Sequence, residues 1–478
     1  MTSQERIHAE ELFFEGSRLL AGGDAPSAEM CFREAVRIAP NFAEACANLA
    51  LMLDQRGAAD PAEFYYLRSI ALDPERAQTH VNLGALLAQR KRFAEAEAAY
   101  IQAISIEPDA PAAWSNLGVL YACMKREEDA ERCYRTAMAL DEDYRAARFN
   151  LSYLLLRQAR FEEGWHFLEA RDSYAALAAR LDCPRWQGEA LAGKSLLIGY
   201  EAGHGDMIQF CRYATMLKAQ GASSIAMICH PALKRLFATL DGVDTLYSLD
   251  QPFPMTGWDF WTPVLSIPYH CKTRSDSIPA DLPYLQAASD LIARWAADIP
   301  AGGLRVGLVW KGNPNFENDE DRSLPGLDVL APLSTVTGVH LIGLQKDWKK
   351  DETSRPPAEF SLLHLGDGIT DFADTAAIVA QLDLVICVDT ALAHLAGALG
   401  KPCWVLLPDY KTDWRWLIGR SDSPWYPGIM RLFRQPEIGN WTAVIAEVRA
   451  SLEQLVQEQN CGAPWKARWR DEIPAPPH

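Results

Sequence analysis

A dipeptide that recurs every 34 residues places the strongest constraint on the fold of this 478-residue chain. Asn-Leu stands at positions 48/49, 82/83, 116/117 and 150/151. A small residue and, four positions later, an aromatic residue recur with the same period: Ala62 and Tyr66, Ala96 and Tyr100, Ala130 and Tyr134. A period of this length is typical of stacked helix pairs, each with an apolar face that it cannot bury alone. The spacing therefore predicts an α-helical solenoid of five units over residues 1–178, the last of them degenerate.

After about residue 180 the pattern changes to short apolar runs that alternate with helical stretches. The runs indicate buried parallel strands, at residues 195–200, 224–229, 305–310, 340–345, 384–388 and 403–408. Such alternation predicts doubly wound α/β sheets. We expect two Rossmann-like domains, at residues 179–302 and 303–457, with a cleft between them and a tail at residues 458–478. Ligands of open α/β sheets bind outside the carboxyl ends of the strands, so the loops that follow the strands are the candidate site.

The first loop, GYEAGHGDMIQF, follows the first predicted strand. It contains three glycines that bracket His204 and Asp206. Glycines at a turn before a helix allow the backbone to approach a ligand closely. Both polar side chains are capable of proton transfer, so each is a candidate catalytic base. The alternatives are that Asp206 caps the following helix and that His204 is an exposed turn residue.

Two further loops follow strands of the second block. One of them, the second loop, is WKGNPNFENDEDRSLP. It contains Lys311, Asn313 and Arg322, whose donors suit phosphate oxygens. Gln345 and Lys346 follow the next strand and are candidates for contacts to a ribose or a base, or else simple loop residues. Acidic residues also occur in the second loop, but such residues are usually solvated, and we expect no metal site there.

The third loop, VDTALAHLAGALGKP, lies at the hinge between a buried strand and a helix. Thr390 is a plausible N-cap, which leaves the N–H groups of Ala391 and Leu392 without intrahelical partners. Such a helix terminus attracts anions, phosphates above all. Asp389 and His394 add two polar side chains at the same strand end. Each alone fits a cap or a half-exposed helical residue, but together with the free amides they favour a binding site.

The repeat segments resemble tetratricopeptide repeats, and WSNLGVLY at residues 114–121 matches that pattern best. In this family the first helix of each pair lines a concave groove. The resemblance therefore implies that the recurring asparagines face a groove: Asn48, Asn82, Asn116 and Asn150. An asparagine ladder can hold an extended peptide by its backbone, because each side-chain amide offers donors and an acceptor. Alternatively, these asparagines cap or bridge neighbouring helices. The resemblance implies a protein partner, and it allows an oligomer that forms through the repeats.

Residues 193 to about 457 resemble bacterial heptosyltransferase-like glycosyltransferases of the GT-B fold, in the variety that follows a tetratricopeptide array. The motifs that carry the resemblance are the GHGD turn, GLVWKGNP with RSLP, VDTALAHLAGALGKP, and DWRW with SPWYP. The resemblance implies Asp206 as the base toward the acceptor, Arg322 as a contact to the donor, and Asp389, Thr390, Ala391, Leu392 and His394 as the grip on its sugar and diphosphate. This chain has Ala391 where the family commonly has Gly and His204 where an apolar residue is usual. The base therefore stays open between Asp206 and His204.

Composition excludes several other functions. The chain has 63 acidic and 46 basic residues and a formal net charge of −17, which argues against a general nucleic-acid binder. It contains neither an apolar run long enough to span a membrane nor a secretory signal, so we expect a cytoplasmic protein without a membrane span. Its 11 cysteines include no CxxC pair and predict neither a disulfide framework nor a zinc site.

Together the two resemblances imply a metal-independent, inverting glycosyltransferase that moves a sugar from a nucleotide sugar to a protein acceptor recruited by the repeats. Flagellin or another surface protein is the candidate acceptor. We expect no cofactor besides the nucleotide-sugar co-substrate. Two alternatives stay open: an enzyme that acts on lipopolysaccharide or another glycan, and a non-catalytic scaffold with a degenerate nucleotide-sugar module. The GHGD turn lacks the GxGxxG spacing of a nicotinamide enzyme.

Overall fold

The computed structural model describes residues 2–346 and 360–460. These residues group into two compact units, of which the first ends at Leu154 and the second begins at Leu155. Of the predicted tail, residues 458–460 belong to the last helix, and residues 461–478 lie outside the described part of the chain.

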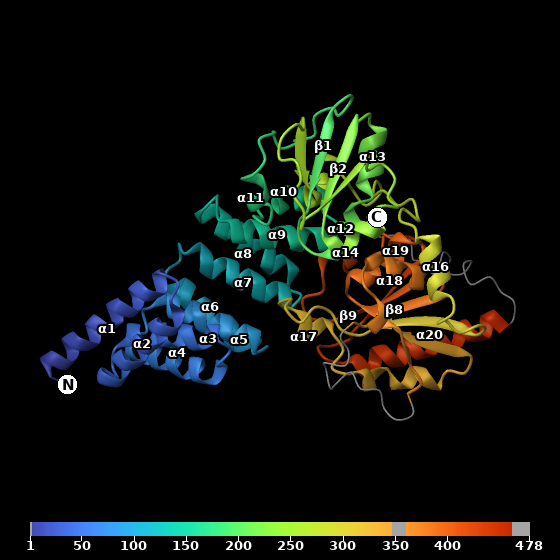
Figure 1. Ribbon diagram of the computed structural model, residues 1–478. Helices are drawn as coiled ribbons and strands as arrows, with labels where there is room; N and C mark the ends of the chain where they lie inside the picture. Colours follow the sequence, from blue (N-terminus) through green and yellow to red (C-terminus); the bar gives the residue numbers. More distant parts are fainter. Residues whose placement is uncertain (1, 347–359, 461–478) are drawn as a thin grey trace. The chain divides into compact units, whose positions relative to one another are not determined.

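The first unit is a stack of antiparallel helix pairs (Figure 1). Its helices are α1 (Ser3–Ala21), α2 (Ala25–Ile38), α3 (Ala43–Gln55), α4 (Ala59–Leu72), α5 (Ala77–Gln89), α6 (Phe93–Ile106), α7 (Pro111–Cys123) and α8 (Glu127–Leu140), followed by α9 (Arg145–Arg157), which crosses into the second unit. The first helices of successive pairs, α3, α5, α7 and α9, begin 34 residues apart. The structure therefore confirms the helical solenoid and its register.

Contact within a pair depends on a small residue in the middle of the first helix. A Cβ atom added at Gly84 would lie 2.7 Å from the ring of Tyr100, and one added at Gly118 would lie 2.7 Å from the ring of Tyr134. Both rings are buried. Burying a side chain of this size contributes about 1.5–3 kcal/mol, so the glycine and the aromatic residue explain why the α5–α6 and α7–α8 pairs close in the same way.

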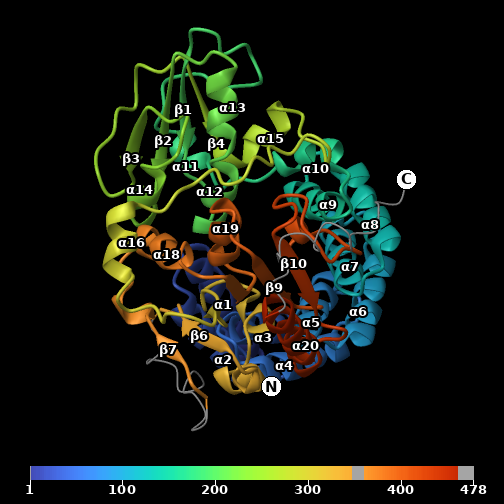
Figure 2. The ribbon, with the colours of Figure 1, turned by 90° about the vertical axis from the view of Figure 1, so that its right-hand side faces the viewer.

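Two parallel sheets form the core of the second unit (Figure 2). The smaller has the strand order β3-β2-β1-β4 and the larger the order β10-β9-β8-β5-β6-β7. The strands are β1 (Ser195–Gly199), β2 (Ser224–Cys229), β3 (Thr245–Ser248), β4 (Phe260–Pro263), β5 (Leu304–Val309), β6 (Val339–Gly343), β7 (Leu363–His364), β8 (Leu384–Val388), β9 (Cys403–Leu407) and β10 (Met430–Arg434). All six predicted strands are present, which confirms an α/β region with parallel sheets. The other four lack the long apolar run on which the prediction depended.

Helices connect these strands and cover the sheets. They are α12 (His204–Phe210), α13 (Tyr213–Ala219), α14 (Pro231–Phe237), α15 (Ile267–His270), α16 (Ser289–Trp295), α17 (Asp319–Arg322), α18 (Phe372–Val379), α19 (Ala391–Ala398) and α20 (Trp441–Asn460), with 3-10 turns η1 (Val264–Ser266), η2 (Leu327–Thr335), η5 (Gly366–Gly368) and η6 (Trp414–Trp416). The helix expected after β1 is interrupted between α12 and α13. At this break the buried guanidinium of Arg212 donates to the carbonyls of Gln209, at 2.8 Å, and Trp425, at 2.7 Å.

The segment between the repeats and β1 belongs to the core of the second unit. On α10 (Phe161–Leu168), the indole of Trp165 meets the ring of Trp414 edge-on, with centroids 5.3 Å apart. Its N–H donates to the carbonyl of Thr273 at 2.9 Å. On α11 (Ala175–Ala178), Leu177 packs against the hydrophobic cluster of the four-stranded sheet. The last helices before the sheets are therefore structural parts of the α/β unit.

Candidate active site

The first loop presents Asp206 at the carboxyl end of β1. The N-cap of α12 is Gly203, so Asp206 lies inside the helix, and the interpretation of Asp206 as the N-cap is wrong. The helix starts earlier than expected because the Asp206 side chain turns back to the cap, where Oδ2 accepts the N–H of Gly203 at 2.7 Å. The other oxygen, Oδ1, accepts a hydrogen bond from the guanidinium of Arg415.

The surroundings of Asp206 suit a proton acceptor. Burial raises the pKa of its carboxyl group, and the Arg415 guanidinium and the Gly203 N–H act in the opposite direction. The side chain remains 20% exposed, so an incoming hydroxyl can reach it. A carboxylate with a raised pKa is a better base near neutral pH than an ordinary aspartate.

His204 points to a different neighbourhood. Its ring meets that of His230 edge-on, with centroids 4.4 Å apart, and lies 5.3 Å from the ring of Phe372 on α18. Burial and the neighbouring His230 lower the pKa of His204. Its Nε2 is buried and makes no hydrogen bond within the described residues. These contacts with other rings make His204 a weaker candidate for the base than Asp206.

The third loop presents the N-terminus of α19 at the carboxyl end of β8. Thr390 occupies the N-cap position with an extended backbone, as predicted, but its hydroxyl makes no capping hydrogen bond. This hydroxyl is buried and has no partner among the described residues. The N–H groups of Ala391 and Leu392 precede the first intrahelical hydrogen bond. The terminus therefore offers donors to an anion.

Asp389 lies next to this terminus at the end of β8. Burial and the neighbouring Asp413 carboxylate raise its pKa to about 6, against the effects of Trp416, Arg322 and Arg415. Asp389 therefore changes its charge between pH 5 and 7. The influence of Arg322 on Asp389 indicates that the second and third loops share one electrostatic environment.

His394 is a buried residue rather than a half-exposed one. Its ring stacks on Trp416 at an interplanar angle of 14°, and Nδ1 lies 2.9 Å from the hydroxyl of Tyr426. Only 5% of His394 is exposed. Burial, with Arg415 and Arg212 nearby, holds the pKa of His394 well below its usual range. The imidazole is therefore neutral at physiological pH.

The first and third loops meet at a glycine. A Cβ atom added at Gly205 would lie 3.0 Å from Cδ2 of His394 and 3.4 Å from the Cα of Ala391. The absence of a side chain at Gly205 thus allows α12 to lie directly against the first turn of α19. This contact brings the helix of Asp206 to the helix that begins beside Asp389.

In the second loop, the side chain of Arg322 is fixed by an ion pair and by contact with an aromatic ring. Its Nε donates to Oδ1 of Asp319 at 3.0 Å, and its guanidinium lies 4.2 Å from the centre of the Phe316 ring. Lys311 is half-buried, whereas Asn313 is exposed and accepts the N–H of Asn315 in a local turn. Arg322 and Lys311 are therefore placed to supply positive charge, and Asn313 shapes the loop.

Gln345 and Lys346 follow β6 at the same edge of the sheet. The side-chain oxygen Oε1 of Gln345 accepts hydrogen bonds from the backbone N–H groups of Trp310, at 3.3 Å, and Lys311, at 3.0 Å. Lys346 is exposed, and its ammonium group lies 3.5 Å from the carbonyl of Thr370. Gln345 thus supports the start of the second loop.

Sequence reasoning missed the residue that links the loops, which is Arg415. It lies in η6, and its guanidinium donates to Asp206, to Gln209 at 2.7 Å and to both oxygens of Asp413 at 3.0 Å. The motif DWRW contains this arginine, but its position in a long loop between β9 and β10 gives no indication of its partners. The aromatic residues of the same region, Trp414, Trp416, Trp425 and Tyr426, are buried, as the packing interpretation predicts.

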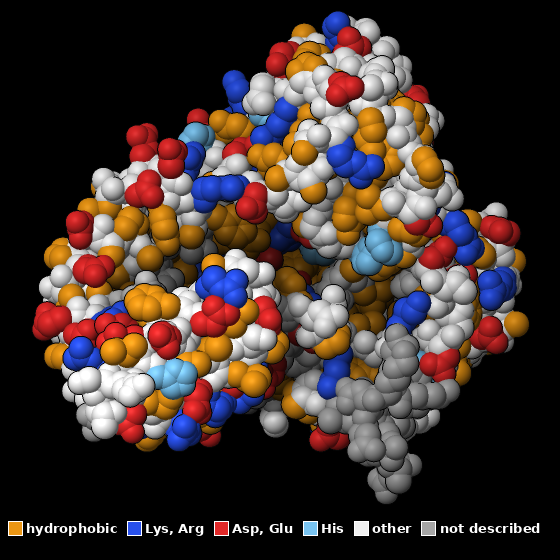
Figure 3. All heavy atoms as spheres, turned by 60° about the vertical axis from the view of Figure 1, so that its left-hand side comes forward, with side chains coloured by type: hydrophobic (Ala, Val, Ile, Leu, Met, Phe, Trp, Pro, Cys, Tyr) orange, Lys and Arg blue, Asp and Glu red, His pale blue; other side chains and the backbone are white. Residues whose placement is uncertain are grey.

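The recurring asparagines lie on the first helices of successive repeats. Asn48, Asn82, Asn116 and Asn150 are all half-buried, on α3, α5, α7 and α9 respectively. The amide of Gln78 donates to the side-chain oxygen of Asn82 at 2.8 Å. The asparagines therefore recur at equivalent positions of these helices and are in part accessible. On the face of the molecule that Figure 3 shows, acidic, basic and apolar side chains are intermixed.

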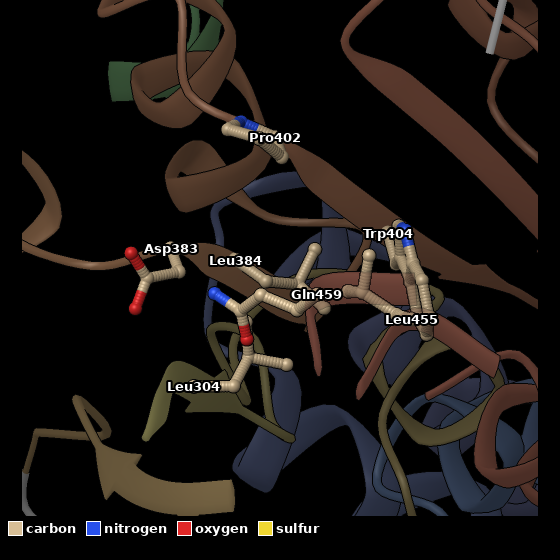
Figure 4. A pocket seen from close by; sticks show the side chains of 7 residues that line it. All are labelled: Leu304, Asp383, Leu384, Pro402, Trp404, Leu455 and Gln459. Atoms are coloured by element: carbon tan, nitrogen blue, oxygen red, sulfur yellow. The ribbon is translucent and has the colours of Figure 1, made fainter. Parts of the chain in front are cut away.

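A pocket lies at the opposite edge of the six-stranded sheet (Figure 4). It is lined by Leu304, Asp383, Leu384, Pro402, Trp404, Leu455 and Gln459. Leu304 and Leu384 are the first residues of β5 and β8, so this pocket opens at the amino ends of the strands. It is therefore not part of the candidate site, whose loops leave the carboxyl ends.

Two further properties of the described residues concern metal binding and membrane insertion. No group of three His, Cys, Asp or Glu side chains in residues 2–346 and 360–460 is arranged to hold a metal ion. Within the same ranges, every helix is too short or too polar to cross a lipid bilayer.

Comparison with known proteins relates both parts of the chain to known families. Tetratricopeptide-repeat models match residues 43–76 and 75–143. The model of glycosyltransferase family 9 (heptosyltransferase) matches residues 344–406, which include the third loop. Protein FlbA of Caulobacter vibrioides is 27% identical over 327 residues, or 63% of this chain and 54% of FlbA. The chain thus spans about half the length of this curated relative.

Solved structures also resemble the chain over about a third of its length. A structure of Pseudomonas aeruginosa PilF is 21% identical over 35% of this chain and 77% of its own, with a TM-score of 0.33. TTC0263, a tetratricopeptide-repeat protein of Thermus thermophilus, is 22% identical over 36% of this chain and 96% of its own, with a TM-score of 0.32. The chain thus combines segments that match tetratricopeptide-repeat models with a segment that matches the model of glycosyltransferase family 9 (heptosyltransferase).

Proposed function

We propose that this chain is a metal-independent, inverting glycosyltransferase of the GT-B type, which transfers a sugar from a nucleotide sugar to a protein acceptor. One observation carries the proposal: Asp206 and the N-terminus of α19 follow strands of different sheets and yet lie close together, because Gly205 packs against His394 and Ala391. A base beside an anion site is what sugar transfer from a nucleotide diphosphate requires.

The chemistry divides between the base and the anion site. Asp206 removes the proton of the acceptor hydroxyl as that oxygen attacks the anomeric carbon of the donor. The bond from this carbon to the diphosphate breaks, and the leaving group departs with its negative charge. Arg322, Lys311 and the amides at the start of α19 stabilise this charge, which is the contribution that a metal ion makes in other transferases.

The acceptor is proposed to be a protein because the catalytic region follows a repeat array with a regular row of side-chain amides. Asn48, Asn82, Asn116 and Asn150 recur on successive first helices and are in part accessible. Primary amides can both donate to and accept from the backbone of an extended peptide. Flagellin or another surface protein is the proposed acceptor class.

The affinity for the nucleotide sugar is expected to depend on pH through Asp389. In its ionised form this carboxylate accepts hydrogen bonds from sugar hydroxyls, and its pKa is raised to about 6. Because the group gains its charge as the pH rises through 6, donor affinity is expected to increase several-fold from pH 5 to pH 7. Calorimetric titrations with the nucleotide sugar at a series of pH values measure this affinity. In Asp389→Asn the affinity should no longer depend on pH. An unchanged pH dependence in that variant would refute the role of Asp389 in donor binding.

Transfer of a radiolabelled sugar tests the proposed function directly. The full chain is incubated with a labelled nucleotide sugar and with purified flagellin or another surface protein, in buffer with EDTA. We expect label on protein, and less label with a variant in which Asn48, Asn82, Asn116 and Asn150 are alanine. In a parallel incubation with purified lipopolysaccharide, label on lipopolysaccharide alone would contradict the protein acceptor. Transfer to neither acceptor would refute the proposed enzyme activity.

A further inference from the structure

Arg415 joins two carboxylates that come from different parts of the second unit. Its Nη1 lies 3.0 Å from both oxygens of Asp413, and its Nη2 donates to Asp206. Its Nε donates to the amide oxygen of Gln209, one turn after Asp206 on α12, at 2.7 Å. The side chain is 8% exposed. All three nitrogens of the guanidinium therefore bind protein oxygens, which suits a residue that orients other groups better than one that binds phosphate.

The backbone that carries Arg415 is held in an unusual conformation. Leu417 has φ 52° and ψ 176°, a region that residues with a Cβ atom rarely occupy and that costs about 1–3 kcal/mol. Arg434 stabilises this turn, because its guanidinium donates to the carbonyls of Trp416 at 2.7 Å and Leu417 at 2.8 Å. It also donates to the carbonyl of Arg420 at 3.1 Å. The surrounding contacts thus fix the turn and the direction of Arg415.

Asp206 is held from its own side as well. Oδ2 accepts the N–H of Gly203, and Gly205 leaves no space for a side chain between α12 and His394. The charged and titratable groups that act on Asp206 are Arg415 and Asp413 from the loop before β10, and Glu201 from the loop after β1. The phenol of Tyr200 is a further titratable neighbour. Among these groups, Arg415 is the one that balances negative charge.

We propose that Arg415 is a positioning residue of the transfer reaction, which holds the Asp206 carboxylate toward the acceptor while the two sheets are docked. This inference rests on the proposed function, because it assigns Asp206 the role of base. Arg415 contacts neither substrate. It acts through Asp206, so its loss is expected to change the rate and its pH dependence more than the binding of the donor.

Hydrogen exchange in the protein without ligand tests the contact itself. In Arg415→Gln, the amides of residues 203–210 are expected to exchange about ten- to a hundredfold faster, as the loss of a charge-assisted hydrogen bond implies. Asp206→Asn should give a similar increase, and the double variant no more than either single one. Arg449→Gln is the control, because Arg449 pairs with Glu453 on the exposed face of α20. Unchanged exchange at residues 203–210 in Arg415→Gln would overturn the proposal.

The pH dependence of transfer separates positioning from a general loss of structure. Arg415→Gln removes a positive charge beside Asp206 and is expected to move the acidic limb of kcat, measured at saturating donor, up by about one pH unit. Asp413→Asn removes a negative charge and should move this limb down. Arg415→Lys keeps the positive charge that also acts on Asp389, so it should restore part of kcat while the KM for the donor stays within about twofold of the wild type. A uniform loss of rate without opposite shifts would overturn the role. A chain that transfers no sugar would refute the proposed function, and the exchange data would then show separately whether Arg415 holds Asp206.

Discussion

Asp206→Asn is expected to lower kcat for sugar transfer by about 10²–10⁴-fold, the usual contribution of a positioned general base. The amide cannot take the proton of the acceptor hydroxyl. The donor is proposed to bind at the start of α19 and at Arg322, so its affinity should stay the same. Initial rates at saturating donor, together with calorimetric titration of the same nucleotide sugar, measure the two effects.

Asp413→Asn is the matched control for this substitution. Asp413 contacts the same guanidinium as Asp206, but it lies outside the path proposed for the proton. It should therefore keep most of the rate at neutral pH while Asp206→Asn loses it. If Asp206→Asn transferred sugar at the wild-type rate, the carboxylate would be only a structural partner of Gly203 and Arg415.

A chain shortened to begin at residue 179 is expected not to fold, whereas a chain that begins at residue 144 should fold and bind nucleotide sugar. The shorter chain loses Trp165, and truncation of a buried aromatic residue costs about 3–5 kcal/mol. It also loses Arg171, whose guanidinium binds both oxygens of Glu201 at 2.6 and 3.0 Å. Removal of one partner of a buried ion pair costs about 3–5 kcal/mol more. Together these losses approach the whole stability of a typical domain, about 5–15 kcal/mol.

Circular dichroism and thermal unfolding of the two shortened chains measure this difference. In the full chain, Arg171→Met should destabilise the second unit, because Glu201 is 1% exposed and would lose its partner. Arg449→Met, at a surface pair, should cost no more than about 1 kcal/mol. Cooperative unfolding of the chain that begins at residue 179 would contradict this expectation. It would also support the predicted domain limit at residue 178, which remains a prediction.

The fold could be predicted where the sequence pattern is local and repeated. The 34-residue period gave the starts of α3, α5 and α7, because the same helix contact recurs in every unit. Strands β1, β2 and β8 are uninterrupted apolar runs because both faces of a parallel sheet are covered. Strand β7, with only two residues, has no such run. Its pairing with β6 depends on tertiary contacts that the sequence does not indicate.

The candidate site could be predicted only as far as strand ends define it. Asp389 directly follows β8, and Asp206 lies in the first turn of the helix after β1, so topology places both at the carboxyl ends of strands. Arg415 does not follow a strand, and its partner Asp206 lies about two hundred residues earlier in the chain. The burial of His394 was missed for a similar reason. Helical periodicity places it off the sheet, but Trp416 covers that side of α19.

Thermal unfolding in the presence of UDP-, ADP-, GDP- and CMP-sugars tests whether the loops around Asp206 and the start of α19 bind a nucleotide sugar. A ligand at one hundred times its Kd stabilises the folded state by about 2.7 kcal/mol. For a unit of this size that is a rise in Tm of roughly 5 °C. We expect one nucleotide class to give such a rise, in the wild type and in Asp206→Asn alike. If none of the four classes raised the Tm at millimolar concentration, the proposal that these loops form a donor site would be wrong.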